Sequence, residues 1–449
     1  MGTDTVRARA TDEVAERRRE QHGWYFYDWA CSVYSTSVLT VFLGPYLTAV
    51  AKHAADADGF VHPLGIPIRA GSFFAYAVSA SVILSIFVMP MAGAAADRTG
   101  RKKPLLAASA YLGAAATTGM FFLDGDRYLL GGLLLVVANA SVAVSMVLYN
   151  SYLPQIAPPE ERDAVSSRGW AFGYAAGSLV LIANLVLFTA HDSFGVSEST
   201  AVRICLASAG VWWGAFTLVP LKRLRDRRAA PGARAPAHGW RQLAATVRDM
   251  RGKPLTLSFL FAYLVYNDGI QTVISQASVY GSEELGLSQS TLIVAVLLVQ
   301  VLAVGGALGM GRLARVYGAK RTILGSLVAW TVTLAAGYFL PAGAPVWFFV
   351  LAAGIGLVLG GSQALSRSLF SHLVPSGKEA EYFSAYEMSD RGMSWLGPLL
   401  FGLTYQLTGS YRDAIISLVV FFVIGFALLA RVPVGQAIRD AGNPVPDRI

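Results

Sequence analysis

Long apolar runs, each about the length that a helix needs to cross a lipid bilayer, dominate this sequence. Charged, Pro-rich or Gly-rich interruptions separate twelve of them. The first six are predicted near residues 24–50, 71–94, 104–123, 129–151, 167–190 and 201–220, and the second six near 254–280, 290–311, 321–340, 346–370, 382–407 and 411–431. Charged residues make up only 14% of the chain, against about a quarter in soluble domains. The sequence therefore predicts an all-α integral membrane protein.

Basic residues are distributed unevenly between the two sets of predicted loops. The loops and helix ends on one side hold five of the 36 Lys and Arg residues: Lys52, Arg69, Arg127, Arg203 and Arg412. Because cytoplasmic loops carry the excess of Lys and Arg, both termini are predicted to be cytoplasmic. The net charge of +8 does not indicate nucleic-acid binding, since the basic residues lie in short loops between apolar runs.

The polar segments around and between the apolar runs set the predicted domains. These are a cytoplasmic N-terminal tail (1–23), a first six-helix bundle (24–220), a basic cytoplasmic linker (221–253), a second six-helix bundle (254–431) and a cytoplasmic C-terminal tail (432–449). The linker could contact anionic lipid, but a solvated connection is favoured. Cys31 and Cys205 both fall inside predicted helices, so no structural disulfide is expected.

The sequence carries little that indicates catalysis. It contains no Walker loop, zinc-ligand spacing or nucleophile elbow, and its six histidines are scattered. We therefore expect no enzymatic activity, no metal and no cofactor. Transport driven by ATP would need a partner subunit.

The two halves of the chain repeat one another. The segment GAAADRTGRKK (Gly93 to Lys103) joins helices two and three, and GRLARVYGAKR (Gly311 to Arg321) joins helices eight and nine. Likewise YNDG in helix seven stands where YDWA stands in helix one. Parallel six-helix halves related by an axis along the membrane normal are an established transporter layout. The repeat therefore favours a transporter.

The first of these loops matches the signature of the major facilitator superfamily, G-x-x-x-D-R-x-G-R-[RK], in its expected place between helices two and three. Other stretches, among them YDWACSVYSTSVLTV, YNDGIQTVI and GGSQALSRSLF, closely resemble the vacuole-effluxer-like family. The fungal autophagy members of that family are associated with returning amino acids from the vacuole. The resemblance spans roughly residues 24–431. It implies the major facilitator fold, with two pseudo-symmetric bundles that alternate access around a central site.

The resemblance also implies a gating role for the signature loop, which holds the two halves together on the cytoplasmic side in the outward-facing state. The matching residues are Gly93, Asp97, Arg98, Gly100 and Arg101. Glu387 in helix eleven is added to the predicted gate, with an ion pair to Arg391 as the alternative. The second copy of the loop has Arg315 where the first has Asp97. Helix five lacks the Gly-Pro element of drug-proton antiporters, which argues against a multidrug exporter.

In the superfamily, helices one, four, seven and ten line the central site, and here each carries polar side chains at helical spacing. The predicted substrate-binding residues are Asp28 and Ser32 in helix one, Asn139 in helix four, Asn267, Asp268 and Gln271 in helix seven, and Gln363 and Arg367 in helix ten. Structural hydrogen bonds between helices are the alternative role for these residues.

Depth separates the two aspartates. Asp28 lies near the cytoplasmic end of its helix, where it could cap the helix start. Asp268 lies close to the predicted midplane, where an unpaired carboxylate is costly unless it becomes protonated. Asp268 is therefore the stronger candidate for a substrate, cation or proton site, and possible proton coupling is predicted from it.

An α-amino acid needs one anionic and one cationic partner. Asp268 or Asp28 could bind its amine, and Arg367 or Arg391 its carboxylate, because a guanidinium offers bidentate geometry. Trp395 is the aromatic residue that we add to this predicted site, although most tryptophans in such proteins anchor at membrane interfaces. These residues make an amino-acid-like substrate plausible.

We therefore predict a secondary transporter of small polar metabolites, with amino-acid efflux as the specific function. It would act as a monomer in the cell membrane, with a small-molecule substrate and the lipid bilayer as partners and no nucleic acid. Two alternatives stay open: an exporter of lipid-like or drug-like amphiphiles with the same fold, and a non-transporting membrane receptor or assembly factor.

Overall fold

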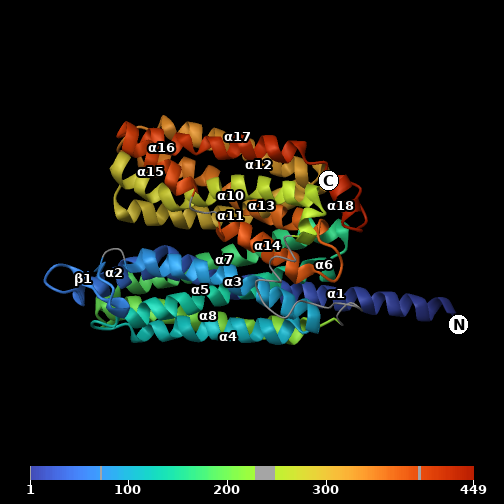
Figure 1. Cartoon of the computed structure of the whole chain (residues 1–449), viewed down its shortest axis with the longest axis horizontal. Coiled ribbons are helices and arrows are strands. Elements are labelled where there is room, and N and C mark those ends of the chain that lie inside the picture. Colours follow the sequence, from blue (N-terminus) through green and yellow to red (C-terminus); the bar gives the residue numbers. More distant parts are fainter. Residues whose placement is uncertain (1, 71–72, 228–247, 393–395) are drawn as a thin grey trace. The chain divides into compact units, whose positions relative to one another are not determined.

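The structure is a computed structural model of the chain and describes residues 2–70, 73–227, 248–392 and 396–449 (Figure 1). The chain forms two compact units. The first comprises Met1–Tyr149 and Ala175–Gly239, and the second comprises Asn150–Tyr174 and Trp240–Ile449. The helix α7 (Arg162–Thr189) therefore begins in the second unit and ends in the first.

The first unit is built from long helices. They are α1 (Gly2–Val33), a π-helical segment (Tyr34–Phe42), α2 (Leu43–His53), α3 (Phe73–Thr99), α4 (Lys102–Gly119), α5 (Tyr128–Asn150), the end of α7 and α8 (Glu198–Arg223). Short 3-10 turns lie at Pro63–Gly65, Met120–Phe122 and His191–Phe194. A two-residue hairpin, β1 (Phe60–Val61) with β2 (Ile68–Arg69), is the sole sheet in the described residues.

The second unit is also helical. It contains α6 (Leu153–Ile156), a 3-10 turn (Pro159–Glu161), the start of α7, α10 (Pro254–Val279), a π-helical segment (Tyr280–Glu284), α11 (Gln289–Tyr317), α12 (Ala319–Tyr338), α13 (Pro345–His372), α14 (Glu379–Gly392), α15 (Leu396–Thr408), α16 (Tyr411–Ser417), α17 (Val419–Arg431) and α18 (Val434–Asp440). The predicted all-α class is thus confirmed.

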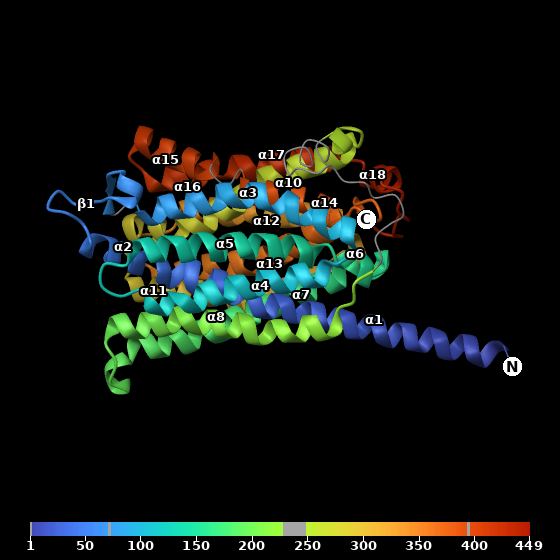
Figure 2. The ribbon, with the colours of Figure 1, turned by 60° about the horizontal axis from the view of Figure 1, so that its bottom comes forward.

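Small residues bring the helices of the first unit close together. α4 and α8 lie side by side in both views (Figures 1 and 2). A Cβ at Gly113 of α4 would lie 2.2 Å from the Trp213 ring of α8, and a Cβ at Gly210 of α8 would lie 2.4 Å from the backbone nitrogen of Thr118. Glycine at these positions lets the backbones approach as membrane helices commonly do.

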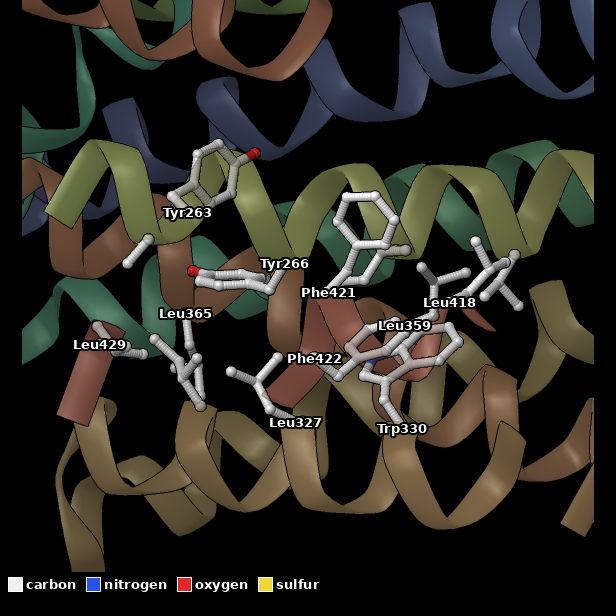
Figure 3. Packing of buried hydrophobic residues seen from close by; sticks show 14 of the residues in the cluster. Tyr263, Tyr266, Leu327, Trp330, Leu359, Leu365, Leu418, Phe421, Phe422 and Leu429 are labelled. Carbon is white, nitrogen blue, oxygen red and sulfur yellow. The ribbon is translucent and has the colours of Figure 1, made fainter. Parts of the chain in front are cut away.

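Aromatic and aliphatic side chains fill the core of the second unit (Figure 3). Trp330 of α12 stacks on Phe422 of α17, with ring centroids 5.4 Å apart and planes 9° from parallel. Tyr263 of α10 stacks on Tyr386 of α14 at 4.4 Å. The second of these contacts holds α10, which carries the polar residues of predicted helix seven, against α14.

Helices occupy all twelve predicted positions. Within the described ranges, nine helical segments combine the length and the apolar composition of a membrane span. Of the other three positions, α10 and α12 carry more polar residues, including Asn267 and Asp268 in α10 and Lys320 and Arg321 at the start of α12, and α14 and α15 are each described over a shorter length. In the region of predicted helix eleven, the structure describes α14 up to Gly392 and α15 from Leu396, and residues 393–395 lie outside the described residues.

Two other segments differ from the division of the sequence into two bundles and two tails. Residues 150–174 lie in the first half of the sequence but pack within the second unit. In the predicted C-terminal tail, Val434, Ala437 and Ile438 of α18 are buried. This spacing of three and four residues places them on one face of a short helix, and that face packs on the core of the second unit.

Candidate functional site

In the first unit, Asp28 is buried against an aromatic group. Its Oδ2 accepts a hydrogen bond of 2.6 Å from the Tyr149 hydroxyl of α5. The Tyr149 ring stacks on Trp24 with centroids 4.3 Å apart, and the Trp24 indole donates to the Tyr149 carbonyl (2.9 Å). This hydrogen bond therefore links α1 to α5, which are the predicted helices one and four.

Asn139 and Ser32 are the other predicted site residues of this unit. Asn139 is 4% exposed, and its Nδ2 donates to Ser81 Oγ of α3 at 2.7 Å. Its Oδ1 is buried and has no hydrogen-bond partner in the described part of the chain. Ser32 is half-buried. The Asn139 amide thus bonds to α3, and the Asp28 carboxylate to a tyrosine near the end of α5.

In the second unit, α10 places Asn267 and Asp268 on its buried side. Asn267 Oδ1 accepts a hydrogen bond of 3.1 Å from Gln363 Nε2 of α13. Asp268 is 3% exposed, and its Oδ2 accepts from the backbone nitrogen of Gly397 at 2.8 Å. Gln271, one turn further along α10, is half-buried.

The second oxygen of Asp268 distinguishes this carboxylate. Asp268 Oδ1 is buried, and among the described residues no group donates a hydrogen bond to it. The donor to Oδ2 is the backbone nitrogen of Gly397, a residue of α15. The site is thus a buried carboxylate with one backbone donor and with its other oxygen available for a proton or a ligand.

Arg367 lies in the same unit and is 1% exposed. Its Nε donates to Ser166 Oγ (3.0 Å), its Nη2 to the Ser166 carbonyl (2.9 Å) and its Nη1 to Asn150 Oδ1 (3.2 Å). The guanidinium carbon also lies 5.4 Å from the centre of the Trp170 ring. Each nitrogen of the guanidinium therefore has a protein acceptor, which fits a clamp between α13 and the start of α7.

The clamp continues to the residue predicted in the gate. Asn150 Nδ2 donates to Glu387 Oε1 of α14 at 2.7 Å, and Glu387 is 5% exposed. Asn150 and Ser166 as partners of Arg367 were not predicted. An arginine inside an apolar helix needs several hydrogen-bond acceptors, so buried partners for Arg367 could be expected. The sequence does not identify which residues supply them.

The signature loop is compact. Asp97 and Lys102 form an ion pair of 3.5 Å with side chains 8% and 6% exposed, and Gly100 has φ of 65°. Arg98 and Arg101 are exposed, and Gly93 is buried. The lysine belongs to the signature but was not among the predicted gate residues.

The second copy of the loop uses its lysine differently. Lys320 Nζ donates to the carbonyls of Ala430 (2.9 Å) and Val432 (2.8 Å), at the end of α17. Cations are favoured at helix C-termini, where carbonyls lack intrahelical partners. The lysine thus caps a helix where the aspartate is replaced by Arg315.

Two predicted site residues cannot be placed. Trp395 and the side chain of Arg391 lie outside the described residues. The described residues include no group of three or more His, Cys, Asp or Glu side chains arranged to hold a metal ion.

Comparison with known proteins places this geometry in context. Residues 16–442 match the family described as "Vacuole effluxer Atg22 like". An uncharacterized MFS-type transporter of Bacillus subtilis, YxiO, is 30% identical over 92% of this chain and 95% of its own length. Autophagy-related protein 22 of Yarrowia lipolytica is 29% identical over 84% of this chain and 78% of its own length. The E. coli fucose:proton symporter FucP shares the fold, with a TM-score of 0.69 at 13% identity over 93% of this chain and 98% of that chain.

Proposed function

The chain belongs to the vacuole effluxer Atg22-like family and is a membrane transporter of the major facilitator superfamily. From this membership and the geometry of the site, we propose that the protein exports a small polar metabolite of the amino-acid class across the membrane. Transport would proceed by alternating access between the two six-helix halves predicted at 24–220 and 254–431. The protein acts as a monomer in the cell membrane with both termini in the cytoplasm.

The observation that carries this proposal is the Asp268 carboxylate. It is buried near the middle of α10, and its Oδ1 has no donor in the described part of the chain. A charged group in such a place is costly and commonly marks a substrate or ion path. Asp268 Oδ1 is therefore assigned either to the substrate amine or to a transported proton.

The neighbouring amides support a polar metabolite. Asn267 and Gln363 form a hydrogen-bonded pair beside Asp268, with Asn267 1% and Gln363 6% exposed. Amide groups both donate and accept hydrogen bonds, so the pair can exchange its internal bond for bonds to a polar ligand. The description of the family as vacuole effluxers supports export. The resemblance of this sequence to the fungal autophagy members, which are associated with returning amino acids from the vacuole, supports the substrate class.

The substrate class is tested by flux in proteoliposomes. Purified protein is reconstituted, and the movement of labelled amino acids is followed with and without a pH gradient. We expect saturable flux of at least one amino acid, above that of empty vesicles. Absence of flux for every amino acid, with the protein folded and monodisperse, would reject this class, and competition by lysolipids would then favour an amphiphile exporter.

The role of Asp268 is tested with a matched pair of variants. With a gradient of one pH unit, coupling to one proton supports about tenfold accumulation. We expect Asp268→Asn to lose this accumulation while still exchanging labelled for unlabelled substrate. Asp28→Asn, which alters the tyrosine-bonded carboxylate of the first unit, should retain coupling. Full pH-driven accumulation by Asp268→Asn would remove Asp268 as the coupling site.

A further inference from the structure

A second group of buried polar atoms lies at the junction of α7 and α13, within the second unit. Four atoms there have no hydrogen-bond partner among the described residues: Asp163 Oδ1 and Ser167 Oγ of α7, and Ser368 Oγ and His372 Nδ1 of α13. The Ser368 hydroxyl lies near the Asp163 carboxylate, across the junction of the two helices. Buried polar groups are nearly always paired, so four such atoms on two adjoining helices indicate a missing ligand or ordered water.

Two of these residues line a pocket of about 280 Å³. Its walls are Pro159, Glu160, Asp163, Ala314, Arg315, Ala319, Leu369, His372, Pro446, Asp447, Arg448 and Ile449. His372 is 3% exposed and lies in the interior, whereas Glu160, Arg315, Asp447 and Arg448 are exposed and mark the mouth. This volume is at the lower end of that of small-molecule sites, so the pocket suits a small metabolite.

The C-terminal segment forms one wall and is fixed in place. Asn443 Nδ2 donates to the carbonyls of His372 (2.9 Å) and Val374 (2.7 Å), and Arg448 Nη1 donates to the carbonyl of Val316 (2.7 Å). Ile449 packs against the core of the second unit. The pocket is therefore bounded by the α11–α12 loop, the end of α13, the start of α7 and this segment.

The charges of the pocket define the chemistry of its ligand. A buried carboxylate oxygen requires a hydrogen-bond donor, and a primary ammonium group supplies a charged one. Arg315 and Arg448 at the mouth offer guanidinium groups, which suit a carboxylate or phosphate. Glu160 and Asp447 also stand at the mouth, and Pro159, Ala314, Ala319 and Leu369 form the apolar part of the lining.

From this arrangement we propose that the pocket binds a small zwitterion carrying a primary ammonium beside an anionic group. The ammonium lies at Asp163 and His372, and the anionic group lies toward Arg315 and Arg448. Two sources share this chemistry: a free amino acid, whose anionic group is a carboxylate, and the head group of an aminophospholipid, whose anionic group is a phosphate.

This site is separate from the one assigned to transport. His372 follows Gln363 by nine residues of one helix, which corresponds to roughly 13 Å along its axis. A ligand held by Asp163 and His372 joins the start of α7 to the end of α13. Its binding therefore stabilises the packing of these two helices, and makes that packing depend on ligand concentration on the side predicted to be cytoplasmic.

The proposal is tested by equilibrium binding to the purified full chain in detergent. L-valine and O-phosphoethanolamine are the two probes, with N-acetyl-L-valine and L-valinamide as analogues that lack one charge. We expect one of the probes to bind and to raise the thermal unfolding temperature, and the analogues to bind at least about tenfold more weakly, because each loses a charged hydrogen-bonding partner. Preference for L-valine identifies a free amino acid, and preference for O-phosphoethanolamine a lipid head group.

Matched variants locate the binding. Asp163→Asn, His372→Gln and Arg315→Ala should each weaken binding about tenfold. Glu161→Gln and Arg312→Ala, which change exposed charges near the pocket but outside its lining, should leave binding unchanged. In Asp268→Asn, the part of the binding that Asp163→Asn and His372→Gln weaken should remain, because this pocket does not include the transport site.

Three results would overturn the proposal. The first is that neither probe binds to folded protein. The second is that binding survives both Asp163→Asn and His372→Gln, which would leave only water in the pocket. The third is that binding is lost in Asp268→Asn alone, which would place the ligand in the transport site.

Discussion

The YDWA and YNDG segments occupy equivalent places in the two sequence halves. Asp28 and Asn267, at the second position of each segment, make similar hydrogen bonds, whereas Trp29 and Asp268, at the third position, do not. Asp28 bonds to Tyr149 on predicted helix four, and its counterpart Asn267 bonds to Gln363 on predicted helix ten. Helices four and ten are themselves counterparts. The repeat thus preserves a polar link between the first and fourth helices of each half.

The next position breaks the symmetry. The first half has Trp29, whose carbonyl accepts from the Trp212 indole at 3.0 Å, and the second half has Asp268, which accepts from the backbone nitrogen of Gly397 at 2.8 Å. The paired position therefore serves the scaffold in both halves, while the added carboxylate is specific to the second. A position at which the two halves of a repeat carry different residues is therefore a better indicator of a functional site than a polar residue that both halves share.

The largest effect is expected from closing the space beside Asp268. In Gly397→Ala, the new Cβ would lie 2.0 Å from Thr272 Oγ1 and 2.9 Å from Thr272 Cβ, and Thr272 is held by its hydrogen bond to the Asp268 carbonyl. Overpacking of this kind should cost about 3 kcal/mol of stability, measured by thermal unfolding in detergent. Gly305→Ala is the control, because nothing lies within 4 Å of its Cβ. Equal stability of the two variants would show that the Asp268 site is loosely packed.

A smaller loss should follow from breaking the polar link of the first unit. Tyr149→Phe keeps the ring that stacks on Trp24 but removes the hydroxyl that donates to Asp28. A hydrogen bond to a charged group contributes about 2 kcal/mol, so unfolding should occur at a correspondingly lower temperature. Wild-type stability would mean that this bond does not hold helices one and four together.

The equivalent link in the second unit should be weaker. Gln363→Met removes the amide that donates to Asn267 and keeps a side chain of similar length. Because both partners are neutral, the loss should be about 1 kcal/mol in the same thermal assay. A loss as large as that of Tyr149→Phe would contradict the smaller contribution expected of a hydrogen bond between two neutral groups.

The smallest effect concerns the acids just before the predicted helices one and seven, Glu20 within α1 and Asp249 ahead of α10. Glu20 accepts from the Arg225 backbone nitrogen and from Arg227 Nη2 (2.8 Å), and Asp249 accepts from Lys378 Nζ (2.9 Å) and the Tyr382 hydroxyl (2.7 Å). Burial acts to raise the pKa of Asp249, but the hydrogen bonds from Lys378 and Tyr382 outweigh it and hold the pKa below its usual value. Stability from this lowered pKa is present above the unfolded value of about 3.9 and is lost as the pH falls through the lower folded value.

Comparison of wild type with Asp249→Asn measures that contribution. The Asp249 side chain is 34% exposed, so solvent screening should keep the difference below about 1 kcal/mol at pH 7. The difference in unfolding temperature should shrink as the pH is lowered below about 4. A difference that grows toward acid pH would contradict the assignment.

Local patterns predict the helices well and the site only in part. Apolar length and polar interruptions predict twelve helical positions because both signals lie within each segment. The depth of Asp268 is predicted for the same reason. Its partner Gly397 is not, because Gly397 lies 129 residues further along the chain.

Long-range partners explain what else was missed. Arg367 bonds to Ser166, 201 residues away, and no local feature connects the two. The buried face of α18, by contrast, is indicated by the sequence. Val434, Ala437 and Ile438 follow the spacing of a helix with one apolar face, within a segment that we predicted as a tail.

The π-helical segments of the two units have a consequence for how these helices tolerate change. Tyr34–Phe42 follows α1, and Tyr280–Glu284 follows α10, so each half has looser winding at the outer part of its first helix. A residue deleted from a regular α-helix rotates everything beyond it by about 100°. A π-turn holds one residue more per turn, so a deletion inside Tyr34–Phe42 can be absorbed by rewinding to α geometry. These segments are therefore where the chain can gain or lose a residue during evolution while the faces on either side keep their orientation.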